Sequence, residues 1–96
     1  MPDLLPDPAA AARDLLAAGW MLDPEGVALE RDYRFPDFAA AFAWMTRVAL
    51  AAERLDHHPD WSNSYGRVHV RLTTHSARGL TERDLALARI MEEAAR

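Results

Sequence analysis

The spacing of hydrophobic residues changes period several times along this 96-residue chain, and this limits the folds open to it. Between residues 27 and 35, apolar and polar side chains alternate with the period of a half-buried strand, and residues 67–74 repeat that alternation. Residues 36–56 and 81–94 instead show apolar residues every three or four positions, the period of an amphipathic helix. Such a pattern predicts an α+β fold, with one antiparallel sheet covered on one face by helices.

Residues that commonly begin helices and form turns mark the predicted boundaries. Asp7 caps an alanine-rich first helix. Near the C-terminus, Thr81 and Asp84 are spaced as the two members of a capping box. Turns at residues 23–26 and near Gly66 predict two hairpins. The predicted order is therefore α-β-β-α-β-β-α, with a four-stranded sheet.

The long middle helix carries an extended apolar stripe. Its members share one face at helical spacing, and we expect that face to enter the core: Phe38, Phe42, Met45, Ala49 and Ala52. The helix should end near Asp56, because Pro59 disfavours a helical backbone at His58.

Composition excludes several classes of protein. The chain has no cysteine, which excludes disulfides, thiol nucleophiles and thiolate metal sites. A formal net charge of −4, with arginines scattered among acidic residues, argues against binding to a nucleic-acid backbone. No apolar run approaches the roughly 20 residues of a transmembrane helix, and the N-terminus lacks a signal-peptide pattern. We expect one cytoplasmic domain spanning residues 1–96, with no membrane partner.

Three of the four histidines lie where predicted elements end. His57 and His58 follow the long helix, and His75 follows the last strand. The two loops can meet at one rim of an antiparallel sheet, where three imidazoles would converge. An imidazole has an unperturbed pKa of about 6.5 and can therefore donate or accept a proton near neutral pH. Because the negative end of a helix dipole favours a cation, we expect His57 to be the better acid.

Other interpretations of these residues stay open. The histidine pair could be a solvated helix end, with His57 bonded to the last carbonyl groups. Three imidazoles could also bind zinc, although adjacent side chains rarely chelate one ion. Asp84 could hold a histidine or only cap its helix, and Glu53 could be a surface charge. Trp61 and Tyr65 could stack on a flat ligand or pack in the core.

The chain resembles a known family through the spacing of its chemical residues. These are Glu53, His57-His58-Pro59, Tyr65, His75 and Asp84. The spacing is similar to that of the pterin-4a-carbinolamine dehydratases, also called 4a-hydroxytetrahydrobiopterin dehydratases. The resemblance covers the chain from its first hairpin onward. It implies a sheet of four antiparallel strands with helices on one face, and the elimination of water from 4a-hydroxytetrahydrobiopterin to give quinonoid dihydrobiopterin.

The resemblance also implies roles for individual residues. It implies catalysis by His57, His58 and His75, acting as general acids and bases. The implied substrate contacts are Asp56, His57, His58, Thr73, Thr74, His75 and Ser76. The implied supporting residues are Glu53, Pro59, Trp61 and Asp84. The pterin is the substrate, so neither a metal nor another cofactor is expected.

The implied setting is tetrahydrobiopterin recycling, with a functional link to an aromatic amino acid hydroxylase. We expect a homodimer or homotetramer with a small-molecule pterin substrate and no nucleic-acid partner. Some animal members of the family also stabilise a transcription-factor dimer. A non-catalytic dimerisation or interaction module of the same fold is therefore the alternative.

Overall fold

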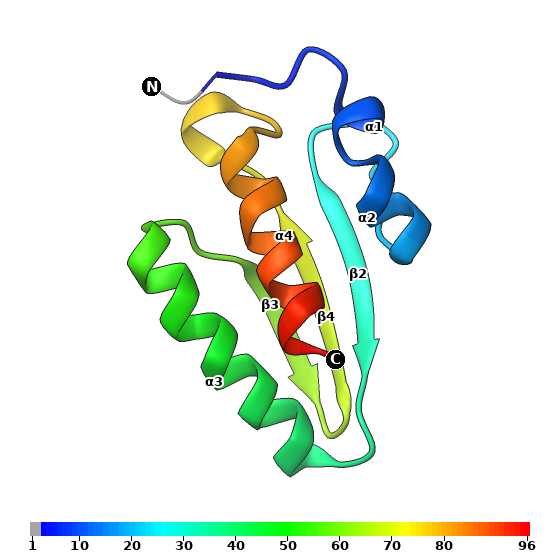
Figure 1. The fold of residues 1–96 in the computed structure, drawn as a ribbon, viewed down its shortest axis with the longest axis vertical. Helices are drawn as coiled ribbons and strands as arrows, with labels where there is room; N and C mark the ends of the chain where they lie inside the picture. Colours follow the sequence, from blue (N-terminus) through cyan, green and yellow to red (C-terminus); the bar gives the residue numbers. More distant parts are fainter. Residues whose placement is uncertain (1–2) are drawn as a thin grey trace.

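Four antiparallel strands form one sheet, and the helices cover one of its faces (Figure 1). The computed structural model describes residues 3–96; the predicted domain also includes residues 1 and 2, which lie outside the described part. The strands are β1 (Met21–Leu22), β2 (Leu29–Arg34), β3 (Asp60–Ser64) and β4 (Arg67–Leu72), in the spatial order β1-β2-β4-β3. The helices are α1 (Pro8–Ala11), α2 (Arg13–Ala18), α3 (Phe38–Leu55) and α4 (Glu82–Ala94), and a 3-10 turn, η1 (His75–Ala77), precedes α4.

This arrangement confirms the predicted fold, with one refinement in the first helix. Asp7 accepts a hydrogen bond from the backbone N–H of Ala10 at 3.2 Å, as a cap should. The helix is then divided at Ala12 into α1 and α2. At the other end of the chain, Thr81 and Asp84 form the predicted capping box of α4.

Both predicted hairpins are present. The carbonyl of Asp23 accepts the N–H of Gly26 at 2.9 Å, which closes the turn between β1 and β2. Tyr65, with a left-handed φ of 50°, and Gly66 form the turn between β3 and β4. On β4 the residues that face the helices are buried, as predicted: Val68, Val70 and Leu72.

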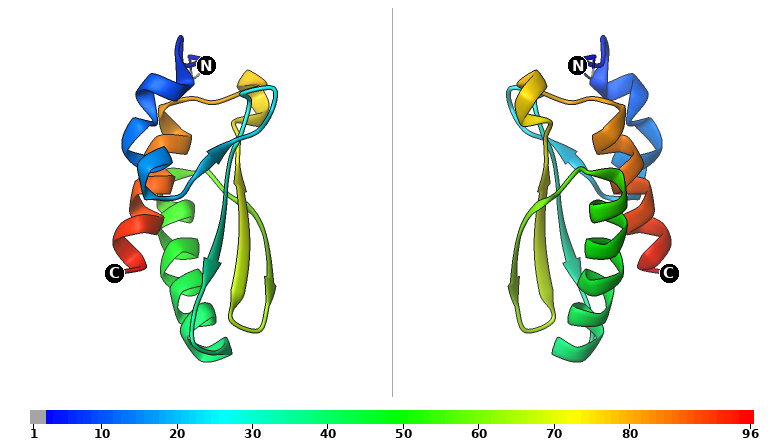
Figure 2. Two further views of the ribbon diagram at one scale, coloured as in Figure 1. Left: turned by 90° about the vertical axis from the view of Figure 1, so that its right-hand side faces the viewer. Right: turned by 90° about the vertical axis from the view of Figure 1, so that its left-hand side faces the viewer.

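The other face of the sheet carries charged side chains. Nδ1 of His69 lies 2.8 Å from Oδ1 of Asp32, and Nε2 lies 3.1 Å from Oε1 of Glu30. Arg71 also pairs with Glu30, at 3.1 Å. Figure 2 shows this face directed away from all the helices. The alternation predicted from the sequence therefore separates a core face from a polar face.

The face of α3 that enters the core is not the predicted one. Phe38 and Phe42 are 47% and 55% exposed, and Ala49 is also exposed. Of the predicted face, only Ala52 is buried, while Met45 is partly covered. The buried residues form the neighbouring stripe: Ala41, Trp44, Val48, Ala51 and Ala52.

The small and large residues of this neighbouring stripe explain the packing of α3. Its alanines let the helix backbone approach its neighbours closely, and Trp44 fills the space beneath them with its side chain fully buried. The indole N–H of Trp44 donates to the carbonyl of Met91 on α4 at 3.1 Å, so this ring satisfies its one polar group within the core. Periodicity alone could not choose between two adjacent apolar stripes on one helix.

One carboxylate joins the end of α4 to the sheet. Oε2 of Glu92 accepts hydrogen bonds from Nε1 of Trp20 at 3.0 Å and from the guanidinium of Arg31 at 2.7 Å. The hydroxyl of Tyr33 donates to the same oxygen. Arg31 also donates to the carbonyl of Ala18 at 2.7 Å, which ties the end of α2 to β2. In the part of the chain that the structure describes, no helix is long and apolar enough to cross a lipid bilayer.

Candidate active site

The end of α3 determines where His57 lies. Asp56 has a φ of 52°, in the left-handed region that aspartate tolerates better than most residues. The N–H of His57 donates to the carbonyl of Ala52 at 3.1 Å, and the N–H of Asp56 donates to that of Glu53 at 3.2 Å. These two bonds form a Schellman motif. The helix therefore ends where predicted, but the left-handed Asp56 ends it, and Pro59 follows in the exit segment.

Asp84 is a fully buried carboxylate that contacts His57 directly. Its Oδ1 lies 2.6 Å from Nε2 of His57, a side chain that is itself buried. Its Oδ2 accepts the N–H of Thr81 at 2.9 Å and the hydroxyl of Thr74 at 2.7 Å. Asp84 also lies in the first turn of α4, where the helix dipole favours a negative charge. Both interpretations of Asp84 therefore hold, because it caps α4 and holds a histidine.

The other two histidines of the motif are exposed, and each lies near an acidic side chain. Nε2 of His58 is 2.8 Å from Oε1 of Glu53. Nε2 of His75 is 3.4 Å from Oδ2 of Asp60. The exposed fractions of the two histidine side chains are 56% and 77%. Such exposed pairs stabilise a fold little.

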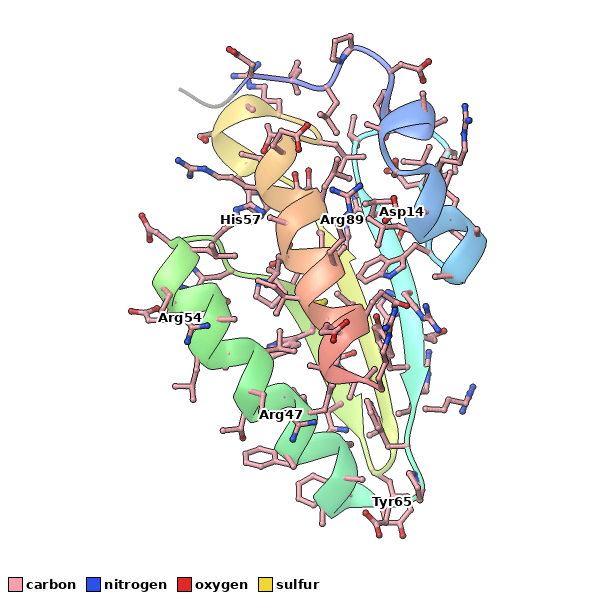
Figure 3. The ribbon with its side chains drawn as sticks, in the orientation of Figure 1. Asp14, Arg47, Arg54, His57, Tyr65 and Arg89 are labelled. Carbon is pink, nitrogen blue, oxygen red and sulfur yellow. The ribbon has the colours of Figure 1, made fainter. Side chains whose placement is uncertain are left out.

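A cavity of about 240 Å³ brings the three histidines together at the rim formed by the ends of α3 and β4. It is lined by Asp56, His57, His58, Thr73, Thr74, His75, Ser76 and Arg83. Figure 3 shows His57 between the end of α3 and the start of α4. Every residue predicted to contact substrate thus lines one cavity, although the contacts themselves stay predictions.

Two aromatic residues of the motif region lie elsewhere. Trp61 is partly buried against the core, with its ring centroid 6.2 Å from that of Trp44. Tyr65 is 67% exposed at the turn between β3 and β4, at the opposite end of the molecule from η1 (Figures 1 and 3). The spacing of Tyr65 in the motif therefore reflects its place in a hairpin turn and not a place at the cavity.

Sequence reasoning missed two charged residues of this region. Arg83 lines the cavity from the first turn of α4. Its position beside Asp84 in the predicted capping box could have indicated this, because residues next to a site residue in the first turn of a helix also lie near the site. Asp60 lies beside His75 and is the first residue of β3. It directly follows Pro59 in the sequence, but its pairing with His75 was not predicted, because that contact forms only when β3 and η1 come together in the fold.

The cavity can exchange protons with a bound molecule at several points. It combines three imidazoles, a carboxylate at Asp56 and a guanidinium at Arg83. Imidazoles can act as acids or bases near neutral pH, and a guanidinium presents several N–H donors. Among residues 3–96, no group of three or more histidine, cysteine, aspartate or glutamate side chains is arranged to hold a metal ion.

Comparison with known protein sequences identifies similar proteins over most of the chain. A family model described as pterin 4 alpha carbinolamine dehydratase matches residues 5–94. A relative from Bordetella avium, provisionally named pterin-4-alpha-carbinolamine dehydratase, is 55% identical over 76 residues, which are 79% of this chain and 70% of the relative. A relative of the same name from Novosphingobium aromaticivorans is 53% identical over 85 residues, covering 85% of this chain and 88% of the relative.

Two solved structures share the fold. A protein described as a transcriptional coactivator/pterin dehydratase from Brucella melitensis matches with a TM-score of 0.86 at 42% identity, covering 97% of this chain and 99% of that one. A pterin dehydratase-like protein identified as a RuBisCO assembly factor in the alpha-carboxysome matches with a TM-score of 0.70 at 20% identity, covering 80% and 89%. At the identity of the second protein, the likeness extends to the fold alone.

Proposed function

The chain belongs to the pterin 4-alpha-carbinolamine dehydratase family, and from this premise we propose that it removes water from 4a-hydroxytetrahydrobiopterin. The product would be quinonoid dihydrobiopterin. The observation that carries the proposal is the meeting of His57, His58 and His75 around one cavity. The pterin would bind there as the substrate, and the reaction changes no oxidation state, so it requires no redox cofactor. We further propose that the protein acts in the cytoplasm, in the recycling of tetrahydrobiopterin beside an aromatic amino acid hydroxylase.

The proposed reaction needs one proton donor and one proton acceptor. The C4a–O bond breaks, and the departing hydroxide takes a proton to leave as water. The proton on N5 passes to a base, and its electron pair forms the C4a=N5 double bond. Proton transfer by positioned side chains contributes about a hundredfold to ten-thousandfold to such steps.

His57 and His75 occupy different environments, which suits opposite roles in this reaction. His57 is buried and contacts the carboxylate of Asp84, whereas His75 is largely exposed. From its place at the end of α3, we expect His57 to be the better acid. We therefore assign the proton donor to His57 and the acceptor to His75. His58, held by Glu53, would orient the substrate at the rim.

A rapid-mixing assay with freshly generated 4a-hydroxytetrahydropterin tests the proposal. His57→Gln keeps an N–H that can reach Asp84 but removes the second ring nitrogen, and His75→Ala removes the proposed base. Each variant should lower turnover by about a hundredfold or more. His69→Gln is the matched control, because His69 lies on the polar face of the sheet, away from the cavity, and should retain the wild-type rate. Wild-type rates in both site variants would refute the assignment.

Activity in the presence of a chelator separates the proposed reaction from zinc catalysis by the same histidines. General acid and base catalysis needs only the protonation states of the imidazoles, so the rate should be unchanged by the chelator. A rate that falls on chelation and returns with added zinc would instead support a metal enzyme.

We also propose that the protein forms a homodimer or homotetramer. Phe38 and Phe42 stack on each other at a centroid distance of 5.6 Å on the exposed side of α3, and Leu50 is 61% exposed on the same helix. An apolar surface of this kind favours association. Light scattering coupled to gel filtration should give a mass above that of one chain, and Phe42→Asp should lower it. A monomeric wild-type protein at micromolar concentration would contradict this.

The alternative function is a non-catalytic interaction module. It is favoured by the Brucella melitensis structure, described as a coactivator as well as a dehydratase. The dehydratase assay discriminates between the two, because a module without catalysis would give the same rate in wild type and in His57→Gln.

A further inference from the structure

We propose that Thr74 is a positioning residue: with Thr81 behind it, its hydroxyl fixes the proton of His57 on Nε2 and leaves Nδ1 to act in the cavity. The inference deepens the proposed function, since it names the nitrogen through which His57 would transfer a proton. It follows from a count of the protons around the buried carboxylate of Asp84.

Asp84 is surrounded by donors. Its Oδ2 accepts the backbone N–H of Thr81 and the hydroxyl of Thr74, and its Oδ1 faces Nε2 of His57. The side chain is fully buried, so water cannot replace a missing donor. An ionised carboxylate only accepts hydrogen bonds. The proton in the 2.6 Å contact between His57 and Asp84 must then belong to Nε2.

The two threonine hydroxyls form a chain with one direction. Thr74 has a single hydroxyl proton, which it donates to Oδ2 of Asp84 at 2.7 Å. Its contact with the Thr81 hydroxyl at 2.8 Å must therefore use the proton of Thr81. Thr81 in turn accepts the backbone N–H of Arg83 at 3.3 Å. The donors thus run from Arg83 through Thr81 and Thr74 to Asp84, an order in which each hydrogen bond polarises the next.

Since Nε2 of His57 faces Asp84, the other ring nitrogen, Nδ1, is the one that can face the cavity. Among the described residues, every buried side-chain nitrogen and oxygen has a hydrogen-bond partner. Nδ1 of His57 has none of the hydrogen bonds found within residues 3–96, so this atom is open to solvent. Since His57 lines the cavity, Nδ1 is the nitrogen available to a bound molecule. As a cation, His57 would donate the proton of Nδ1 to the bound molecule, while its Nε2 proton stays on the ring and hydrogen-bonds to Asp84.

Both threonines are suited to hold a carboxylate and not a substrate. Thr74 and Thr81 are 3% and 1% exposed, so neither hydroxyl exchanges partners with water. Thr73, the neighbouring residue of the cavity lining, donates its own hydroxyl to the carbonyl of Val27 at 2.6 Å. Thr74 therefore acts through Asp84, although it was predicted from the sequence as a substrate contact.

Without the Thr74 hydroxyl, the proton of neutral His57 should no longer be confined to Nε2. In Thr74→Val the side chain keeps its shape, but Oδ2 of Asp84 loses a buried donor that nothing can replace. The carboxyl group can then hold a proton itself, and Nε2 of His57 can accept it. The imidazole would in that case be neutral with its proton on Nδ1, and a neutral imidazole is a weaker proton donor to the cavity than the cation that an ionised Asp84 can hold.

The experiment reads the tautomer directly by 15N NMR of the histidine rings, without pterin, and measures dehydratase turnover separately. Wild type should show neutral His57 with its proton on Nε2, whereas Thr74→Val should show a share of the Nδ1–H form. Turnover in Thr74→Val should fall about tenfold, the lower end for loss of a residue that orients a functional group. KM should change less than about twofold, because the lost interaction is not with the substrate.

Two further variants make the result specific. Thr74→Ser restores the donor and should restore both the tautomer and turnover. Thr46→Val removes a hydroxyl that donates to the carbonyl of Phe42 on the exposed side of α3, and should change neither. If Thr74→Val does not fold, Thr74→Cys takes its place, because a thiol is a weak donor and should shift the tautomer in the same direction.

The outcomes separate this inference from the proposed function. A wild-type tautomer and wild-type turnover in Thr74→Val, or a serine variant that stays impaired, would overturn the positioning role. A wild-type protein without dehydratase turnover would refute the proposed function, yet the NMR comparison of wild type and Thr74→Val would still decide the role of the hydroxyl chain.

Discussion

Replacing Glu92 with glutamine measures how firmly one carboxylate joins α4 to the sheet. Three donors converge on its Oε2, from Trp20, Arg31 and Tyr33. A hydrogen bond to a charged group contributes about 1.5–3 kcal/mol, against about 0.5–1.5 kcal/mol for a neutral one. Loss of the charge therefore removes about 1 kcal/mol for each bond. Because Arg31 and Glu92 are 24% and 23% exposed, solvent screening reduces the total to about 2 kcal/mol.

For a domain of this length, a loss of about 2 kcal/mol lowers the melting temperature by about 10 °C. Circular dichroism during thermal and urea unfolding measures both quantities. Glu93→Gln is the control, since Glu93 is exposed and pairs only with Arg96, at 3.6 Å, among the described residues. We expect it to lie within about 0.5 kcal/mol of wild type. Equal midpoints for the two variants would show that the convergence of donors on Glu92 has no stabilising role.

Three further predictions concern other parts of the fold. Burial and the neighbouring carboxylate of Glu92 raise the pKa of Tyr33 above its ordinary value of 10.0. The stability contributed by the neutral Tyr33 hydroxyl is therefore complete below pH 10 and is lost as pH rises. Above pH 10, the free energy of unfolding of Tyr33→Phe should fall less steeply than that of wild type, and identical slopes would contradict this. A Cβ at Gly66 would lie 2.4 Å from the carbonyl oxygen of Phe35, so Gly66→Ala should destabilise by about 2 kcal/mol in urea unfolding; a midpoint like that of wild type would argue against the contact. The hydrogen bond from His69 lowers the pKa of Asp32. In His69→Gln, carboxyl NMR titration should therefore give a higher pKa for Asp32, and an unchanged pKa would show that this bond is absent in solution.

The order of elements was predictable because independent local signals agree with one another. The capping box of Thr81 and Asp84, the turn at Asp23 and the alternation along β4 each specify a boundary or a face without reference to the rest of the chain. The pairing of β2 with β4, which joins the two hairpins, was not predicted, because alternation specifies a buried face and not the neighbouring strand.

The buried face of α3 was not predictable in this way. Its apolar arc is wider than one interface requires, and Phe38 with Phe42 competes with Trp44 for the core. Hydrophobicity favours the phenylalanines, whereas close packing favours the alanines flanking Trp44. That choice depends on how near α4 lies, which is a tertiary distance that no local spacing contains.

Most members of the candidate site were predictable, although Arg83 was missed, and of its polar contacts only a histidine partner for Asp84 was anticipated. Spacing of the histidines indicated that two loops meet, and one cavity does contain all three rings. The partners of the rings come from separate elements: Asp84 from α4, Glu53 from α3 and Asp60 from β3. Of these, Asp60 was not identified, because its contact with His75 depends on the fold and not on the sequence between them.

Asp84 shows why fold and candidate chemistry cannot be separated by removing it. The same carboxylate caps α4, accepts the Thr74 hydroxyl and holds His57. Its removal would leave buried donors of Thr74, Thr81 and His57 without an acceptor, at about 1–3 kcal/mol for each, which is a large part of the stability of a small domain. An Asp84 variant that loses activity would therefore not distinguish a lost proton relay from a damaged helix start. Substitutions that remove a single proton donor, such as Thr74→Val beside Thr74→Ser, leave the carboxylate and its helix in place, and so they isolate the chemistry from the fold.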